Sequence, residues 1–362
     1  MNEAYNAILR CIDYLENQQK TGYYEATHQM QFPNIYSRSN DYDFHEGVVF
    51  QRAIICDALL DAQDTDFKIN TKGLVQDIQL LINSKCADVA AGWRYFPTLQ
   101  YLPPDADDLG QILQVLVRTH VDNISELVDE AIELIFTQGK YSDGSFETWI
   151  VDHNDQSDTN KFMLKAIETM WGKGPDVEVM ANLLYALNMY NPKKYHSEIK
   201  EGCQFIIRSL VSPGYWNSTW YTDKFYATFV CSRLISIIFP SSDILNNVHA
   251  FIVSSQKQDG AWGNKEGNPL QTSLVLLSLM AIMLSGRTVK RTVIDKGIEC
   301  LVSSQTEQGS WRGTPFIQMN TNRVDTLRGE GHPRIITYKS NTITSAFCLK
   351  ALSQFYLNNI KL

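Results

Sequence analysis

The sequence predicts an all-α protein, a single (α/α)6 barrel with an inner and an outer ring of helices. Three observations lead to this fold. Short Gln/Gly/aromatic turns recur six times along the 362 residues, each turn follows an amphipathic run, and each precedes a more uniformly apolar run. An outer helix shows one polar face to water, whereas an inner helix is covered on both sides and loses its polar stripe.

The turns are clearest in the C-terminal half of the chain. Ser254–Gly263 reads SSQKQDGAWG and Ser303–Gly313 reads SSQTEQGSWRG. Four looser copies end at Tyr24, Trp93, Trp149 and Trp216. Glycine in such a turn permits backbone conformations that other residues avoid, and a Gln side chain can satisfy free amides or carbonyls at a helix end. The repeat of Gln, Gly and Trp together indicates a structural unit.

Six apolar runs follow the turns and are the expected inner helices. Their approximate bounds are 43–62, 107–120, 176–190, 224–239, 270–285 and 341–356. Amphipathic runs such as 244–253 and 293–302 precede them as outer helices, and we expect residues 1–362 to form one domain. Three irregular stretches, 22–40, 150–174 and 313–340, are long for loops in a compact domain and are typical of lids or site walls.

Composition limits the partners that the chain can have. The formal net charge is −8 and no block of Lys and Arg stands out, which argues against nucleic acid. Seven scattered cysteines without a CxxC pair suit reduced thiols in the cytoplasm. The longest apolar run, 270–286, is interrupted by polar residues and short for a bilayer span. We therefore expect a soluble, cytoplasmic protein with at most peripheral membrane contact, and the sequence leaves its oligomeric state open.

Three carboxylates stand at the start of the second apolar run. The stretch Tyr101–Leu113 reads YLPPDADDLGQIL and places Asp105, Asp107 and Asp108 between two prolines and a helical pattern. Such acids can cap a helix, bind Mg²⁺ through oxygen ligands, or deliver a proton. An acid at a helix start is most often a cap, so these residues alone leave all three interpretations open.

The turns and the acids together resemble a known family. The two C-terminal turns look like the QW repeats of the triterpene cyclases, and DADD looks like the DxDD motif of their proton-initiated, class II members. Further stretches match squalene–hopene cyclase in order: AGWRYFP, DGSFETWIVD, DVEVMANLL, GYWNSTWYTDKFYATFV and GNPLQTSLVLLSL. The chain is similar in size to the monodomain bacterial terpene and meroterpenoid cyclases. The stretch 316–340 departs from the hopene pattern.

This resemblance implies an isomerase that folds a linear isoprenoid, such as a prenylated aromatic acid, into fused rings without a cofactor. It implies Asp107 as the proton donor, with Asp105 and Asp108 as its partners. Asn182 stands where the cyclases often have a His partner to the acid, and its amide could donate to Asp107 or accept from it. Because a helix N-terminus favours ionised acids, we expect Asp105 or Asp108 to cap the helix and leave Asp107 neutral.

A cationic reaction also needs a wall that attracts positive charge without reacting with it. Each desolvated aromatic ring contributes on the order of 2 kcal/mol or more through cation–π attraction. The aromatic residues in the matched stretches are Trp93, Tyr95, Phe96, Trp149, Trp216, Trp220, Tyr221, Phe225 and Tyr226. Aromatic residues in repeats are also typical of protein cores. Arg334, in the basic stretch 322–339, could hold an anionic head group or belong to a solvated loop.

Two other functions are compatible with the sequence. Many (α/α)6 barrels are glycoside hydrolases or lyases. Such an enzyme would use two carboxylates about 5–10 Å apart, such as Asp107 with Glu147 or Asp152. A non-catalytic isoprenoid- or lipid-binding protein would keep the barrel and need no acid. Neither a His/Cys metal pattern nor a second acidic cluster is evident in the sequence, so we expect no metal site. Whether Mg²⁺ assists a diphosphate substrate stays open.

Overall fold

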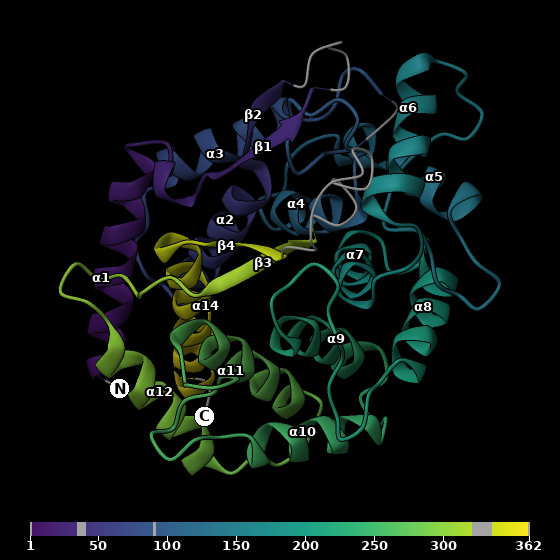
Figure 1. The fold of residues 1–362 in the computed structure, drawn as a ribbon. Helices are drawn as coiled ribbons and strands as arrows, with labels where there is room; N and C mark the ends of the chain where they lie inside the picture. Colours follow the sequence, from purple (N-terminus) through teal and green to yellow (C-terminus); the bar gives the residue numbers. More distant parts are fainter. Residues whose placement is uncertain (1, 35–40, 90–91, 321–334, 361–362) are drawn as a thin grey trace.

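Two concentric rings of helices form the molecule, as Figure 1 shows. The computed structural model describes residues 2–34, 41–89, 92–320 and 335–360. The inner helices are α2 (Val49–Gln63), α4 (Ala106–Arg118), α7 (Val177–Tyr190), α9 (Lys224–Ile238), α11 (Pro269–Leu284) and α14 (Asn341–Ile360). The outer helices are α1 (Asn2–Gln19), α3 (Thr71–Asn83), α5 (Ile124–Gln138), α8 (His196–Arg208), α10 (Ile244–Ser254) and α12 (Arg291–Ser304). The (α/α)6 barrel predicted from the sequence is thereby confirmed.

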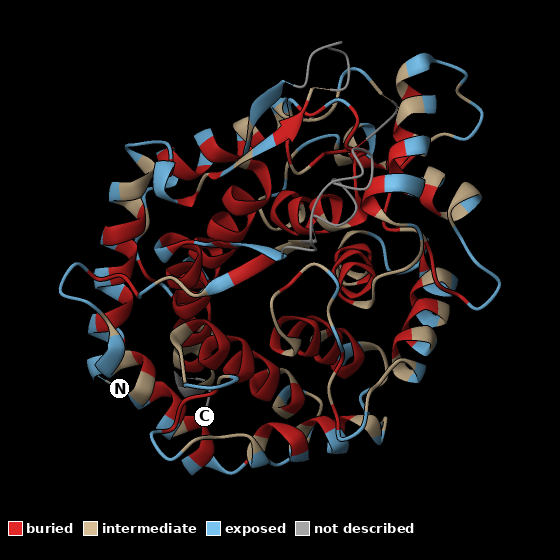
Figure 2. Cartoon of the chain, in the orientation of Figure 1, coloured by how far each residue is buried: buried red, intermediate tan, exposed pale blue. Residues whose placement is uncertain are grey.

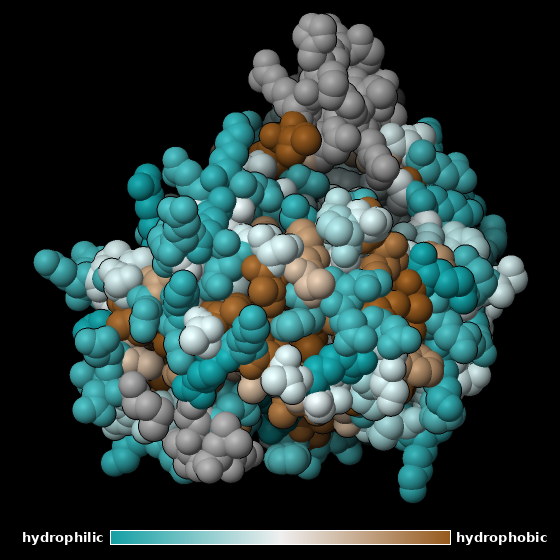
Figure 3. Space-filling view, turned by 90° about the horizontal axis from the view of Figure 1, so that it is seen from below, coloured by the Kyte–Doolittle hydropathy of each residue, from teal (hydrophilic) through white to brown (hydrophobic). Residues whose placement is uncertain are grey.

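The two rings differ in burial as the apolar patterns predict. In α2 every residue from Val49 to Ala62 is buried, whereas α8 buries one face and leaves the other in water. Figure 2 shows the inner ring almost entirely buried and the outer ring with exposed faces. Figure 3 shows the flank that carries α10, where hydrophilic side chains predominate and hydrophobic groups show between them. Each inner helix packs on the next, and α14 packs on α2, which closes the ring.

Short elements occupy the three stretches that the sequence left irregular. The first holds η1 (Tyr24–Ala26) and part of a hairpin of β1 (His28–Pro33) and β2 (Tyr42–Gly47), the second holds α6 (Asp158–Ala166) and a π-helical turn (Ile167–Trp171), and the third holds β3 (Pro315–Asn320) and β4 (Ile335–Lys339). The predicted inner helix over 43–62 was wrong at its start, because residues 42–47 pair with β1 and the helix begins at Val49.

The repeated tryptophans hold each turn to the outer helix before it. Trp93, Trp216, Trp262 and Trp311 are each fully buried. Their indole N–H groups donate to the carbonyls of Leu81, Ile206, Ile252 and Leu301 at 2.7–2.8 Å. These carbonyls belong to the last turn of an outer helix, where they lack the amide partner four residues later that a carbonyl in the helix interior has. Each of these carbonyls also accepts from the serine three residues later, and the Trp of the turn adds a second, buried donor that fixes the turn against the helix end.

The Gln of the last turn joins the two ends of the outer ring. Its side-chain nitrogen, Nε2 of Gln305, donates to the carbonyl of Ala7 in α1 at 2.9 Å and to the carbonyl of Gly309 at 2.9 Å. Gly309 has a φ of +84°, and a Cβ there would lie 2.2 Å from the carbonyl oxygen of Arg10. Glycine is therefore required both for the backbone conformation and for the close approach of α1.

A buried group of charges joins the first and last inner helices. The Lys350 ammonium of α14 lies 2.8 Å from both Asp57 and Asp61 of α2. Arg118, the last residue of α4, contacts the same two carboxylates at 2.5 and 2.7 Å. Cations are favourable at the C-terminal ends of helices, where the backbone carbonyls are unsatisfied. This cluster ties three inner helices together at the end of the barrel where α4 ends.

We predict that Lys350→Met will destabilise the protein by about 3–5 kcal/mol, because the change leaves buried carboxylates without one of their cations. The free energy of unfolding is measured by urea denaturation. Lys200→Met, on the exposed side of α8, is the control and should change it by less than about 0.5 kcal/mol. Equal effects of the two substitutions would contradict a structural role for the cluster.

Candidate active site

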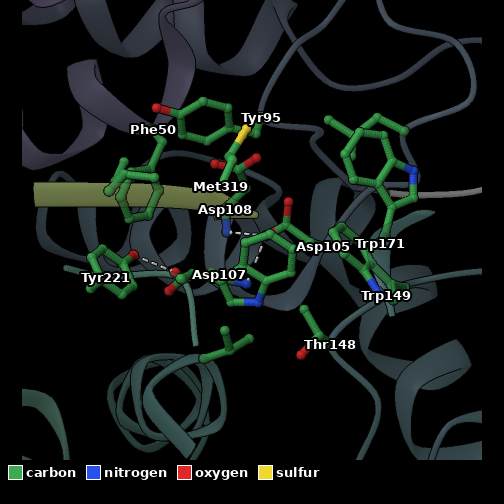
Figure 4. Close-up of a pocket in the computed structure, with 14 residues that line it drawn as sticks. Phe50, Tyr95, Asp105, Asp107, Asp108, Thr148, Trp149, Trp171, Tyr221 and Met319 are labelled. Atoms are coloured by element: carbon green, nitrogen blue, oxygen red, sulfur yellow. Dashed lines mark hydrogen bonds between the residues drawn. The ribbon is translucent and has the colours of Figure 1, made fainter. Parts of the chain in front are cut away.

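A small cavity of about 60 Å³ lies where the inner helices α2, α4 and α7 begin. The residues that line it are Phe50, Tyr95, Leu102, Asp105, Asp107, Asp108, Thr148, Trp149, Trp171, Val179, Trp220, Tyr221, Ile317 and Met319. In Figure 4, Phe50 and Tyr221 lie on one side of the acids and Trp149 and Trp171 on the other. The wall is therefore mostly aromatic and aliphatic, with three carboxyl groups gathered at one place.

Asp105 caps α4. Its backbone is extended, with φ −134° and ψ 160°, and its Oδ1 accepts hydrogen bonds from the N–H groups of Asp107 at 3.0 Å and Asp108 at 2.8 Å. The N–H groups of Asp105 and Ala106 donate to the carbonyls of Trp93 and Thr148, which fixes where the helix begins. Since Asp105 takes up the free amides of the first turn, the side chains of Asp107 and Asp108 can make other contacts.

Asp107 faces the cavity and has two hydrogen-bond donors. The hydroxyl of Tyr221 donates to Oδ2 at 2.5 Å, and Nδ2 of Asn182 donates to Oδ1 at 2.8 Å. Removal from bulk water raises the pKa of Asp107 from 3.8 to about 7. The bond from Tyr221 lowers that pKa, the charge of Asp105 raises it, and the bond from Asn182 lowers it. The net result is a carboxyl group that holds its proton close to neutral pH.

The two neighbouring acids have different environments. Both oxygens of Asp108 are buried without a hydrogen-bond donor among the described residues. Burial first, and then the charges of Asp105 and Asp107, hold the pKa of Asp108 well above its usual range. Burial also raises the pKa of Asp105 to about 6, although the two backbone N–H groups favour its ionised form. The acid at the helix cap therefore ionises most readily, and Asp108 stays neutral.

The wall beside the acids is anchored by two carboxylates at the start of α7. Asp176 accepts from the indole N–H of Trp220 at 2.8 Å and from the hydroxyl of Thr148 at 2.8 Å. Oε1 of Glu178 accepts from the backbone N–H groups of residues 219 and 220 at 2.7 and 3.1 Å. Strand β3 pairs with the same segment, because the N–H of Gln318 donates to the carbonyl of Trp220 at 2.9 Å. Trp220 is thus held through both its ring and its backbone.

Four of the aromatic residues expected at the wall line the cavity, namely Tyr95, Trp149, Trp220 and Tyr221. Five others do not, namely Trp93, Phe96, Trp216, Phe225 and Tyr226. The indoles of Trp93 and Trp216 hold their turns, and Phe96 packs against Phe32 with ring centroids 5.0 Å apart. Phe225 and Tyr226, in the first turn of α9, belong to the main core. Arg334 lies outside the described residues.

The sequence did not single out several lining residues. Phe50 stands in the first turn of the first inner helix, and Trp171 ends the π-helical turn. Ile317 and Met319 come from β3. The one available signal was the length of the irregular stretches 150–174 and 313–340, which contain Trp171 and β3. Tertiary contacts decide which residues of these stretches face the acids. One such contact is the hydrogen bond from the indole N–H of Trp171 to the carbonyl of Tyr101 at 3.2 Å.

Glu147 and Asp152, the second carboxylates expected of a glycoside hydrolase or lyase, lie away from the cavity. Glu147 contacts the hydroxyl of Tyr141 and the N–H of Gly174, and Asp152 accepts from Gln138 at 2.9 Å. Neither residue lines the cavity. Within the described ranges, no three or more His, Cys, Asp or Glu residues are grouped to hold a metal ion. No helix in those ranges is both long and apolar enough to span a bilayer.

Comparison with known proteins identifies the family to which the chain belongs. Residues 81–357 match the squalene–hopene cyclase C-terminal domain family. The chain belongs to this family. It is 21% identical to the squalene–hopene cyclase of Zymomonas mobilis over 289 residues, which are 73% of this chain and 40% of that enzyme. It is 22% identical to the squalene–hopene cyclase of Bradyrhizobium diazoefficiens over 39% of this chain and 23% of that enzyme. The matched regions span less than half of these relatives.

Several solved structures share this fold. The type II terpene cyclase MstE from Scytonema has a TM-score of 0.70 at 18% identity, with 98% of each chain covered. The ent-copalyl diphosphate synthase from Streptomyces platensis has a TM-score of 0.57 at 17% identity over 85% of this chain and 50% of that one. A possible GH105 member from Klebsiella pneumoniae has 0.60 at 11% identity, covering 99% and 94%. The same fold therefore occurs in a terpene cyclase and in a possible GH105 member, so the fold alone does not define the reaction.

We predict that Tyr221→Phe will raise the pKa of Asp107 by about one unit or more, because a hydrogen bond to the charged form is lost and such bonds contribute about 1.5–3 kcal/mol. The measurement is an infrared titration of the carboxyl band that disappears in Asp107→Asn. Tyr95→Phe is the matched control, since its hydroxyl contacts Gln51 and His28 and not Asp107. A band that titrates at the wild-type pH in Tyr221→Phe would refute the assignment.

Proposed function

We propose that the protein is a class II terpene or meroterpenoid cyclase, an isomerase in which Asp107 protonates an alkene of a linear polyprenyl substrate. The observation that carries this proposal is a carboxyl group with a pKa near 7 at the wall of an apolar, aromatic cavity. Membership of the squalene–hopene cyclase C-terminal domain family supports the same class of reaction. We further propose that residues 1–362 act as one catalytic domain in the cytoplasm.

Protonation of an isolated alkene requires an acid that keeps its proton at working pH and a site that stabilises the charges that form. In the proposed step the O–H bond of Asp107 breaks and the π electrons of the alkene form a new C–H bond. The adjacent carbon becomes a tertiary cation and Asp107 becomes a carboxylate. Tyr221 and Asn182 already donate to this carboxyl group, so both bonds strengthen as its negative charge develops.

The cation then moves along the chain as neighbouring double bonds attack it and rings close. The faces of Trp149, Trp171 and Trp220 attract positive charge and offer no nucleophile that would trap it. Loss of a proton from the last cation balances the proton gained from Asp107. Substrate and product are therefore isomers, and the chemistry needs no cofactor.

The substrate class that we propose is a linear isoprenoid, with prenylated aromatic compounds as the leading candidates. The Scytonema enzyme was solved in complex with geranylgeranyl dihydroxybenzoate as its substrate. Pockets for organic ligands measure about 300–1,000 Å³, whereas this cavity measures about 60 Å³. The cavity therefore holds only part of a polyprenyl chain, and we propose that the wall moves outward when the chain enters. Asp107 would meet the alkene end of that chain.

We predict that Asp107→Asn will fold, retain substrate binding and lose turnover by several orders of magnitude, since an amide cannot supply the proton. The assay follows conversion of geranylgeranyl dihydroxybenzoate to a cyclic product of the same mass. Asp152→Asn removes an acid that does not line the cavity and should retain activity. Turnover by Asp107→Asn at the wild-type rate would contradict the proposal. Binding of the compound by the wild-type protein without conversion would favour a lipid-binding function.

The pH dependence follows from the same group. Asp107 must be protonated to react, and its pKa is raised to about 7, so kcat/KM is full below that pH and falls as the pH rises through it. Above the pKa we expect about a tenfold loss per pH unit. The measurement is kcat/KM for geranylgeranyl dihydroxybenzoate between pH 5 and about 9 at constant ionic strength. Activity that instead rises through this range would show that an ionised group is required.

A further inference from the structure

Asn182, the partner of Asp107, has every polar atom of its side chain in use. The residue is fully buried in α7. Its Nδ2 donates to Oδ1 of Asp107, while its Oδ1 accepts from Nε2 of Gln114 at 2.7 Å and from Nη2 of Arg233 at 3.3 Å. An Asn amide can in principle sit in two orientations that exchange oxygen and nitrogen. The partners of the amide decide which orientation the protein adopts.

Gln114 and Arg233 each allow only one orientation of the Asn182 amide, with its oxygen toward them. A guanidinium has donors and no acceptor, so the atom of Asn182 that faces Arg233 must be its oxygen. Nε2 of Gln114 also donates to the carbonyl of Gly110 at 3.1 Å, and a carbonyl can only accept, so Gln114 presents its amino group to Asn182 as well. A flipped amide would place its own NH2 against two donors in a buried site. Its NH2 therefore points to Asp107.

Arg233 is held in an unusual way for a cation so close to the core. Its guanidinium carbon lies 3.7 Å from the ring centroid of Tyr185 and 5.0 Å from that of Phe229. Among the described residues it has no carboxylate within ion-pair distance, and its buried Nε has no hydrogen-bond partner. Ring stacking, Asn182 and the charge of nearby Asp57 thus hold this guanidinium. The guanidinium is half-buried, and one of its donors is directed at Asn182.

We propose that Gln114 and Arg233 are positioning residues that hold the NH2 of Asn182 toward Asp107 and leave the transferable proton on Oδ2, the oxygen that Tyr221 contacts. This inference rests on the proposed cyclase function and names residues that act through Asn182. An amide NH2 can only donate, so Oδ1 is a poor place for a proton. The hydroxyl of Tyr221 can donate to an ionised Oδ2 or accept from a protonated one, so the proton belongs on Oδ2. Tyr221 lines the cavity, so the proton on Oδ2 is available to the substrate.

The reversed amide would have the opposite effect. A carbonyl of Asn182 facing Oδ1 would accept the proton of Asp107 and hold it on the side away from Tyr221. It would also stabilise the neutral acid and withdraw a donor from the carboxylate, so that the pKa of Asp107 would rise while proton transfer to the substrate became slower. The other titratable and charged groups around Asp107 are Asp105 and Asp108 in α4, Asp176 and Glu178 at α7, and Tyr221 and Tyr226 at α9. None of these changes in the variants below.

The test removes both donors with Gln114→Met/Arg233→Met. We expect the pKa of Asp107 to rise by about one unit or more and turnover below that pKa to fall at least about tenfold. KM should stay within about twofold, since neither residue lines the cavity. The pKa is read twice, from the falling limb of the kcat/KM profile and from the infrared band of the Asp107 carboxyl group. The infrared reading needs no substrate, so it tests the positioning roles even if the protein proves not to be a cyclase.

Two controls separate orientation from other effects. Gln114→Met/Arg233→Lys keeps the positive charge and one donor, and should show less than half of the shift. Gln111→Met changes a buried glutamine one turn earlier in α4 and should leave the pKa unchanged. If the double methionine variant does not fold, Gln114→Met alone should shift the pKa in the same direction. An unmoved pKa, or a loss of turnover with an unmoved pH profile, would overturn the inference.

Discussion

The proposed reaction needs a carboxyl group that keeps its proton, yet Asp107 stands in the first turn of a helix, where the backbone field favours the ionised form. Asp105 resolves part of this conflict, because its side chain accepts the amide N–H groups of the turn. Exclusion of water at the cavity resolves the rest and brings the pKa of Asp107 to about 7. Asp108, buried and without a donor among the described residues, stays neutral beside it. The proposed chemistry depends on this division among three adjacent acids.

The two ends of the barrel carry different charged groups. The cavity lies where inner helices begin, and the cations Arg118 and Lys350 lie toward the other end, beside Asp57 and Asp61. Cations near helix C-termini stabilise the fold. A helix N-terminus stabilises the ionised form of an acid, and an ionised acid cannot donate a proton. The helices therefore contribute stability at one end. At the other end the side chains around the acids must counteract the helix field.

The six repeats were enough to predict the barrel and all six inner helices, because each apolar run must be covered on both sides. The site was predicted less completely. Trp93 and Trp216 recur at equivalent turns and therefore serve the turn, through bonds to the preceding outer helix. Trp149 stands at the same place in its repeat but donates to the carbonyl of Gly172, beyond α6, and so reaches the cavity. That difference, like the position of Trp171, depends on contacts between distant segments that periodicity does not encode.

Transfer of a proton from Asp107 to carbon is tested most directly by running the reaction on geranylgeranyl dihydroxybenzoate in D2O. Asp107 exchanges its proton with solvent between turnovers, so each cyclic product should carry one deuterium at the carbon that was the CH of the terminal double bond. No other carbon should gain deuterium, although one loses a hydrogen when the last cation is deprotonated. A cyclic product without deuterium at that carbon would contradict protonation as the first step.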